Sequence, residues 1–553
     1  MLTDHNWILS VGVFLPLVGV FVMLFVPKES ESFHKGFAIL TAAATLVVGI
    51  VTLAWFKYGS ESSKLQFHVD ATWIPAIKSR YIIGLDGVSL PLYILSMVIT
   101  LLVMIYSWDH IPDPGNAKAF MILMLILQTG MAGTFVAQDL ILFFVFFEIV
   151  LLPMYFMIGV WGGEERQYAS LKFFLYTMFG SALMLVAFLA LFFQTGAQSF
   201  SLEYLYAHSN MISTNVAVWI FAGMFVGFAV KVPMFPFHTW LPDAHTQAPT
   251  QGSVILAAIL LKLGTYGFIR IAIPTLPQAA IKWAPVIGVL AVIGIIYGAL
   301  GCLAQTDMKR LIAFSSVAHM GFVMLGISTL TQFGVNAAIF GMVAHGLITG
   351  MLFFLAGSIK NRYHTLEIAK MSGILKRIPR LGWILGMCAM ASLGLPGLAG
   401  FWGEFPAILS AYSPAPGLSK PLFRTLMVIA ALGTVLAAGY LLWLFQRVAF
   451  GEASPLVAGD VDADGNVLTH GDSAGHAAAA GGYGHGAVAL SVGAAGNADP
   501  HAEVHDVGIF EWIAWTPLLI GIVVFGAYPD LMFKVMDGSV TKLLAPVQAL
   551  TGK

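Results

Sequence analysis

The stretch Phe228-Ala-Val-Lys-Val-Pro-Met-Phe-Pro-Phe-His-Thr-Trp-Leu-Pro-Asp-Ala-His-Thr-Gln-Ala-Pro249 begins inside an apolar run that is long enough to cross a membrane. Pro233 and Pro236 each remove a backbone donor in mid-helix, so this span is expected to be broken. A second apolar run contains Gly394-Leu-Pro-Gly-Leu-Ala-Gly-Phe-Trp-Gly-Glu404, with one proline and four glycines. Freed backbone groups are tolerated at membrane depth only against protein or a water-filled cavity. Two broken helices in separate parts of the chain indicate a transport site between them.

The composition is that of an integral membrane protein. Apolar residues make up 58% of the 553 residues and charged residues 10%, against about 25% charged in soluble proteins. The mean hydropathy is +0.85. The 27 basic and 28 acidic residues nearly cancel, so we expect the lipid bilayer as a partner and no nucleic acid. The cysteines, Cys302 and Cys388, are too few for a four-thiolate iron–sulfur cluster.

Apolar runs predict an all-α membrane protein with about fourteen transmembrane helices. The predicted spans are 7–26, 36–56, 82–107, 118–136, 139–160, 169–193, 216–241, 252–273, 284–304, 311–329, 335–358, 381–411, 422–448 and 509–533. An even number places both termini on one side of the membrane. Six basic residues lie in the loop 359–380, which predicts a cytoplasmic or matrix position for this loop and termini on the outer side.

Several titratable residues lie near the middle of these runs. Ten residues of helix rise about 15 Å, which is half of a ~30 Å hydrocarbon core. The side chains expected near the midplane or beside a break are Glu148, Lys231, Lys262, His319, His345 and Glu404. Ionisable residues at such depth are functional by default, although a buried structural salt bridge and structural histidines are the alternatives. His238, beside the first break, is expected either to line a water path or to cap freed carbonyl groups.

Residue spacing predicts two inverted five-helix repeats. Lys231 and Glu404 lie 173 residues apart, and Glu148 and His319 lie 171 apart. A repeat of that length holds five spans, and an odd number of spans makes the second copy run in the opposite direction. The expected units are residues 1–117, 118–273 (helices 4–8), 284–448 (helices 9–13), 449–508 and 509–553.

The segment 449–508 differs in composition from the rest of the chain. It is rich in Ala, Gly, Asp and His, and a flexible loop is predicted. Asp460-Val-Asp-Ala-Asp-Gly465 imitates the start of a calcium loop, but the twelfth position is Gly471 instead of glutamate. His501 and His505 have the i,i+4 spacing of metal ligands, but they lie in a loose context. We therefore expect no metal site in the chain.

The broken-helix stretches, together with Ser315-Ser-Val-Ala-His-Met-Gly321 and Ala344-His-Gly346, resemble the antiporter-like subunits of respiratory complex I. The resemblance covers the chain except residues 451–508. It implies a fourteen-helix fold with two inverted repeats and assigns the family's key residues to Glu148, Lys231 and Lys262. In the twelfth helix, Glu404 matches the branch of the family that has glutamate where its sister subunits have lysine. The related subunits of multi-subunit sodium/proton antiporters are the alternative.

The resemblance implies proton translocation in the bacterial inner membrane, within a complex of further membrane subunits that include neighbouring antiporter-like ones. Glu148 and Lys231 are expected to form an ion pair that controls proton release toward Lys262. The two histidines would relay the proton to Glu404, the exit group. The chain has no phosphate-binding loop, dinucleotide fingerprint or cluster-binding cysteine set. FMN, iron–sulfur clusters, NADH and quinone are therefore expected in partner subunits.

Overall fold

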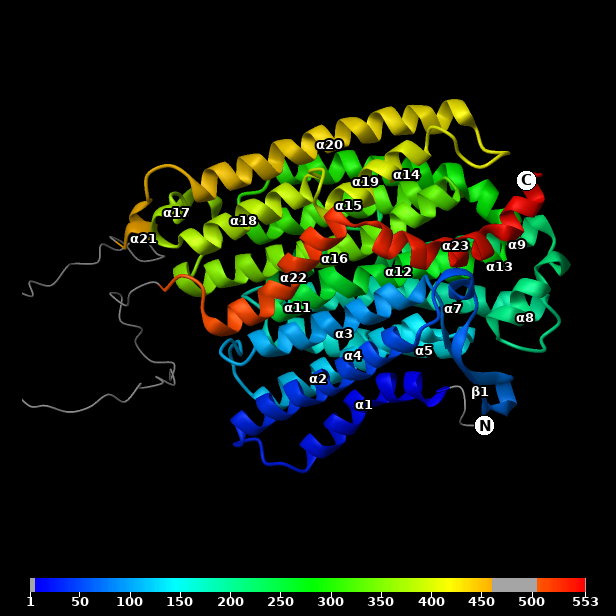
Figure 1. The fold of residues 1–553 in the computed structure, drawn as a ribbon, viewed down its shortest axis with the longest axis horizontal. Coiled ribbons are helices and arrows are strands. Elements are labelled where there is room, and N and C mark those ends of the chain that lie inside the picture. Colours follow the sequence, from blue (N-terminus) through cyan, green and yellow to red (C-terminus); the bar gives the residue numbers. More distant parts are fainter. Residues whose placement is uncertain (1–4, 460–504, 553) are drawn as a thin grey trace, which may run out of the picture.

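Long apolar segments form helices that run side by side along the molecule in the computed structural model (Figure 1), which describes residues 5–459 and 505–552. Within these residues, thirteen helical segments are long and apolar enough to cross a membrane. The remaining predicted span, 381–411, is the broken pair α18 (Pro379–Ser392) and α19 (Ala399–Ser410). The prediction of an all-α membrane fold is confirmed.

The N-terminal part contains three spans and a small β-hairpin. The spans are α1 (Trp7–Leu24), α2 (Glu31–Trp55) and α3 (Ser89–Tyr106). Between α2 and α3 lie the 3₁₀ turn η1 (Gly59–Ser63), strand β1 (Gln66–Ile74), the turn η2 (Pro75–Ile77) and strand β2 (Ser79–Leu85).

The prediction that a span begins at residue 82 is wrong. Ile82 belongs to β2 and pairs with Asp70 of the antiparallel strand β1. A short buried apolar strand cannot be distinguished from a helix start by periodicity alone. The predicted span therefore joined the end of β2 to α3.

The first expected repeat begins with two spans, of which the second carries Glu148. They are α4 (Ala117–Val136) and the helix pair α5 (Leu140–Ile149) and α6 (Leu151–Trp161). Next come α7 (Arg166–Gln194), α8 (Leu202–Ala207), η3 (Ser209–Met211), α9 (Thr214–Lys231) and α10 (Trp240–Gln247). The eighth span consists of α11 (Thr250–Ile255), η4 (Leu256–Leu260), α12 (Leu261–Gly267), η5 (Phe268–Ala272) and α13 (Ile273–Thr275). Both η4 and η5 are π-helical, and such widened turns are frequent at functional sites.

The second expected repeat has the same order of long helices. It contains α14 (Pro277–Leu303), α15 (Met308–Ser328), α16 (Gln332–Tyr363), η6 (Ile368–Lys370), α17 (Ile374–Arg377), α18, α19 and α20 (Lys420–Ala449). In each set the fourth span is broken, at residues 232–239 and 393–398. Lys231 lies before its break and Glu404 lies after the other one, so these two residues are not equivalent positions of a repeat.

The buried centre of the bundle is formed by the eighth span and by α16. The most apolar part of each is buried inside the bundle, and they carry Lys262 and His345. Outer spans such as α7 and α20 expose large apolar side chains, including Phe179, Val186 and Val435. This arrangement places the candidate proton-transfer residues inside protein and away from the lipid-facing surface.

The C-terminal part contains a helix that was not predicted. The last span, α22 (Ile509–Ala527), ends near Pro529, and a separate helix, α23 (Asp530–Thr551), follows. Its buried residues Met532, Met536, Val540 and Leu543 recur every three or four positions. This amphipathic period was the signal that could have predicted α23.

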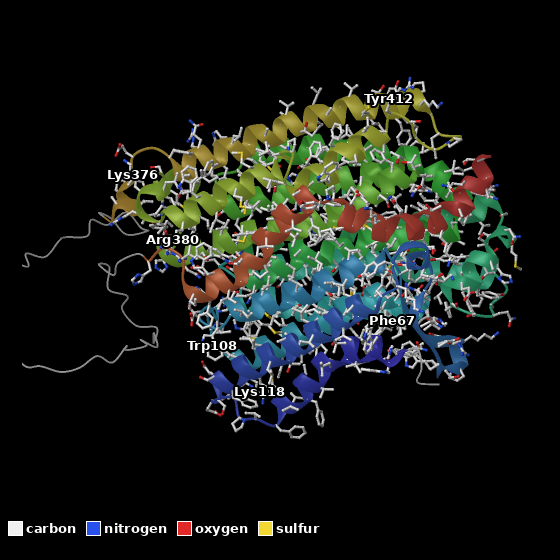
Figure 2. All side chains as sticks on the ribbon, viewed as in Figure 1. Phe67, Trp108, Lys118, Lys376, Arg380 and Tyr412 are labelled. Carbon is white, nitrogen blue, oxygen red and sulfur yellow. The ribbon has the colours of Figure 1, made fainter. Side chains whose placement is uncertain are left out.

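The two ends of the chain lie at the same end of the bundle (Figure 1), as the even number of spans predicts. Figure 2 places Lys376 and Arg380 at the opposite end. The start of the predicted loop is packed there: α21 (Pro455–Ala458) follows α20, and the Lys376 ammonium lies 2.6 Å from the Glu452 carboxylate. The calcium-like stretch Asp460–Gly465, Gly471 and His501 lie outside the described residues.

Candidate functional site

A lysine and a histidine from the two buried central spans are in direct contact. Lys262 Nζ lies 2.7 Å from His345 Nδ1 and donates to the carbonyl oxygen of Ala257 at 2.5 Å. Both side chains are buried. The Ala257 carbonyl belongs to the π-helical segment η4. The widened turn thus supplies the lysine with an acceptor while its remaining contact is the histidine ring.

A second direct contact joins His319 of α15 to Glu404 of α19. His319 Nδ1 lies 2.5 Å from Glu404 Oε1. His319 Nε2 lies 3.1 Å from Ser392 Oγ and 3.3 Å from Tyr440 Oη. Each nitrogen of this ring therefore has a partner, and the ring bridges the carboxylate to two hydroxyl groups.

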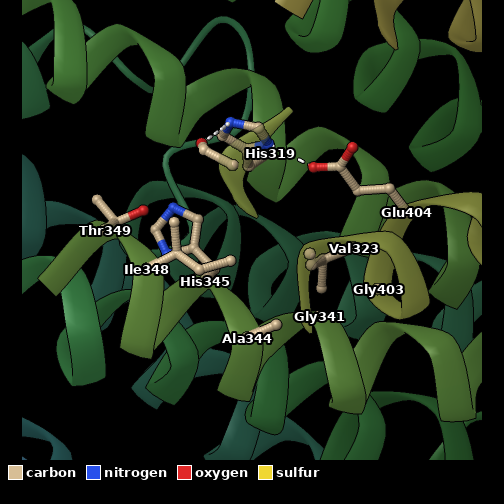
Figure 3. Close-up of a pocket in the computed structure, with 11 residues that line it drawn as sticks. His319, Val323, Gly341, Ala344, His345, Ile348, Thr349, Gly403 and Glu404 are labelled. Carbon is tan, nitrogen blue, oxygen red and sulfur yellow. Dashed lines mark hydrogen bonds and ion pairs between the residues drawn. The ribbon is translucent and has the colours of Figure 1, made fainter. Parts of the chain in front are cut away.

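A small cavity joins these two contacts (Figure 3). His319, His345, Thr349 and Glu404 are among its lining residues. The two histidine rings lie 6.1 Å apart between centroids, which is too far for a direct hydrogen bond. The cavity has a volume of about 20 Å³, which is room for about one water. The arrangement can carry a proton from Lys262 through His345 and His319 to Glu404 with one water in between.

The expected ion pair of Glu148 and Lys231 is not formed in this structure. Within the described residues, Lys231 Nζ has no hydrogen-bond partner, and no acidic oxygen lies within 4.0 Å of it. It lies instead over the Phe147 ring, 4.8 Å from the centroid. Lys231 is the last residue of α9 and is buried, whereas Glu148 near the end of α5 is half-buried. The structure therefore holds this pair in a separated arrangement.

His238 lies in the first helix break, where it is buried among aromatic rings. Its ring lies 5.7 Å from that of Phe235 and 4.9 Å from that of Tyr297. Its Nδ1 atom has no hydrogen-bond partner within the part of the chain that the structure describes. This nitrogen therefore does not cap a freed carbonyl group, and a role of His238 along a water path stays a prediction.

Sequence reasoning missed several buried polar groups around this row. Tyr440 and Ser392 carry hydroxyl groups, which do not stand out in an apolar run as a charged group does. The sequence pattern therefore did not indicate them as site residues. Lys309 and Arg270 were placed near helix ends, but both are buried. Lys309 donates to the carbonyl oxygen of Ala248. No group of three metal-ligating side chains occurs in residues 5–459 and 505–552.

Two family models match the chain. Residues 137–433 match the model described as NADH:quinone oxidoreductase/Mrp antiporter, transmembrane. Residues 11–134 match NADH-ubiquinone oxidoreductase chain 4, amino terminus. Together they cover both the N-terminal helices and the two sets of five spans.

Full-length relatives agree with the family models. NADH-quinone oxidoreductase subunit M of Rhodobacter capsulatus is 41% identical over 80% of this chain and 86% of its own length. NADH-ubiquinone oxidoreductase chain 4 of Marchantia polymorpha is 34% identical over 97% of both chains.

Solved structures show the same fold. A chain of respiratory complex I from Thermus thermophilus superposes with a TM-score of 0.79 at 27% identity, covering 99% of this chain and 100% of that one. A chain of the Mrp complex from Dietzia sp. DQ12-45-1b has a TM-score of 0.80 at 21% identity, covering 100% of both chains. At that identity the second likeness shows the fold alone.

The fold and the buried row of lysine, histidine and glutamate side chains define an antiporter-like membrane subunit. Within that class, the chain belongs to the NADH-quinone oxidoreductase subunit M family, whose members are also named chain 4. Glu404 indicates the chain M branch of this class, which is the counterpart of mitochondrial subunit 4. The relatives confirm this branch.

Proposed function

We propose that this chain, a membrane-arm subunit of NADH-quinone oxidoreductase, translocates protons through Glu148, Lys231, Lys262, His345, His319 and Glu404. The observation that carries the proposal is the pair of direct contacts, Lys262 with His345 and His319 with Glu404, on either side of one water-sized cavity. Four titratable groups from four different helices converge at the buried centre of the chain. Such intramembrane groups mark proton relays.

The first half of the path supplies protons to Lys262. The separated arrangement of Glu148 and Lys231 leaves the Lys231 ammonium without a carboxylate partner, and this loss of stabilisation favours proton release toward Lys262. Closing the pair reverses the preference. Protons enter from the side of the basic loop 359–380, which is cytoplasmic in this proposal, and leave from Glu404 toward the outer side, where both termini lie.

The energy for pumping comes from partner subunits. Moving one charge against 100 mV costs about 2.3 kcal/mol. NADH, FMN, iron–sulfur clusters and quinone lie in other subunits of the complex, because the chain has no cysteine set or nucleotide fingerprint that holds them. Neighbouring antiporter-like subunits in the bacterial inner membrane are its direct partners.

The role of Lys231 is tested by Lys231→Ala in the assembled complex, with protons pumped per NADH oxidised as the readout. The matched control is Lys282→Ala, since Lys282 is exposed on α14. Pumping should be lost in the first variant and unchanged in the second. Normal pumping by Lys231→Ala contradicts the proposal. A sodium gradient formed without quinone reduction would favour the sodium/proton antiporter alternative.

A further inference from the structure

The buried ammonium group of Lys231 has an aromatic ring as its neighbour. Lys231 Nζ lies 4.8 Å from the centroid of the Phe147 ring, within the ~6 Å range of a cation–π interaction. Lys231 is 2% exposed and Phe147 is 1% exposed. An ammonium that has lost its water loses much of its solvation energy, and the negative face of a ring replaces part of it.

Phe147 directly precedes Glu148 in α5. Neighbouring residues on a helix point about 100° apart, so the ring and the carboxylate offer the same lysine two positions beside one turn of helix. Lys231 is the last residue of α9 and is followed by the first break.

The two positions differ in proton chemistry. A carboxylate forms an ion pair with the ammonium, stabilises it strongly and can itself take a proton. A ring face stabilises the charge but has no lone pair that accepts a proton. An ammonium on Phe147 is therefore stabilised less than one paired with Glu148 and releases a proton to water more readily.

Other aromatic rings hold Phe147 in place. The Phe143 ring stacks on it with centroids 5.6 Å apart, and the Phe228 ring meets it edge to face at 6.3 Å. Phe228 lies one turn before Lys231 in α9, so the helix that carries the lysine also helps to orient the ring. The Phe147 face is thus a fixed surface.

We propose that Phe147 is a positioning residue for proton transfer: its ring holds the Lys231 ammonium away from Glu148, and pairing with the ring or with the carboxylate are the two positions of one switch. This inference rests on the proposed function of Lys231.

The test replaces Phe147 with phenylalanine carrying one, two or three ring fluorines in the assembled complex. Fluorine withdraws electron density from the ring face while it changes the shape of the side chain little. Protons pumped per NADH oxidised should fall stepwise with each fluorine. The equilibrium between the two positions should change by about fivefold to thirtyfold for three fluorines, which corresponds to ~1–2 kcal/mol.

Phe120 of α4 is the matched control, because its ring is buried against Trp161 and makes no cation–π contact within the part of the chain that the structure describes. Its fluorinated forms should pump normally. A flat series at Phe147, or an equal decline at Phe120, overturns the inference. If the trifluorinated complex does not assemble, Phe147→Tyr and Phe147→Leu decide: tyrosine keeps a ring face and should retain most pumping, and leucine should lose it, whereas equal pumping by both overturns the inference.

The two proposals fail in different ways. Normal pumping by Lys231→Ala overturns the proposed function of Lys231, and the role of Phe147 falls with it. Loss of pumping in Lys231→Ala together with a flat fluorine series overturns the inference about Phe147 alone.

Discussion

Gly526 of α22 lies directly against Gly397 in the second helix break. A Cβ atom at position 526 would come within 2.3 Å of the Gly397 carbonyl oxygen and within 2.4 Å of Leu398 Cα. The Gly526 carbonyl also accepts a hydrogen bond from Trp402 Nε1 at 2.8 Å. The last span thus contacts both the break and the helix that carries Glu404.

Gly526→Ala is expected to displace the second break, because backbone atoms cannot move aside as the end of a side chain can. Overpacking of this kind costs about 1–3 kcal/mol. Pumping should fall several-fold at normal abundance of the complex, or the complex should assemble poorly. Gly439→Ala on α20 is the control, since within the described residues no atom of another element lies within 4 Å of that Cβ position. Normal assembly and pumping in Gly526→Ala would refute the expected displacement.

Glu404→Gln separates proton transfer from packing. The glutamine can still hydrogen-bond to His319 Nδ1, which lies 2.5 Å from the glutamate oxygen, but it cannot take up a proton. The complex should assemble, and protons pumped per NADH oxidised should fall at least tenfold relative to Glu404→Asp, which keeps a carboxylate. Equal pumping by the two variants would remove Glu404 from the path.

His345→Gln tests the relay beside Lys262. Glutamine can accept a hydrogen bond from Lys262 in place of His345 Nδ1, but it does not exchange protons near neutral pH. Pumping should therefore fall by about 10²-fold or more while the buried lysine keeps an acceptor. His68→Gln is the control, since His68 is exposed in β1. Protons pumped and NADH oxidised are measured on the same vesicles. An unchanged number of protons per NADH in His345→Gln would assign His345 a packing role.

Asp86→Asn tests a buried ion pair that joins the hairpin to the eighth span. Arg270 Nη2 lies 2.5 Å from Asp86 Oδ1 and Arg270 Nη1 lies 2.8 Å from Asp86 Oδ2. Leaving the arginine buried without its carboxylate should cost about 3–5 kcal/mol. The thermal midpoint of the purified complex should drop. Asp70→Asn, which breaks the exposed pair with Arg80, should change stability by at most about 1 kcal/mol, and equal midpoints for both variants would contradict the prediction.

The same pair predicts a pH dependence of stability. Burial raises the pKa of the Asp86 carboxyl, but the charge of Arg270 and the hydrogen bonds to the carboxylate outweigh burial and hold this pKa below its ordinary value of 3.8. A lowered folded-state pKa gives stability that is present above the unfolded-state pKa and is lost as pH falls through the folded-state value. The stability difference between the parent and Asp86→Asn should thus be constant from pH 7 to about pH 5 and should shrink below pH 4.

Sequence and structure agree best on how deep each residue lies along the membrane normal. Each residue of an α-helix advances about 1.5 Å, so the distance of Lys262 or His345 from the ends of its apolar run predicts burial near the midplane. Proline and glycine positions likewise predicted both breaks, because backbone donors and φ restrictions are local properties. Local periodicity failed where β2 runs into α3, since a short buried strand and a helix start share one apolar pattern.

The sequence by itself determined the number and depth of the spans, the two breaks, the family and the titratable residues inside the membrane. Only the tertiary structure decided which of these residues meet: Lys262 with His345, His319 with Glu404, and Lys231 with Phe147 instead of Glu148. The physical reason is that the rise per residue sets the height of a side chain within one helix, whereas the rotation of that helix and the choice of its neighbours depend on how all the helices pack together.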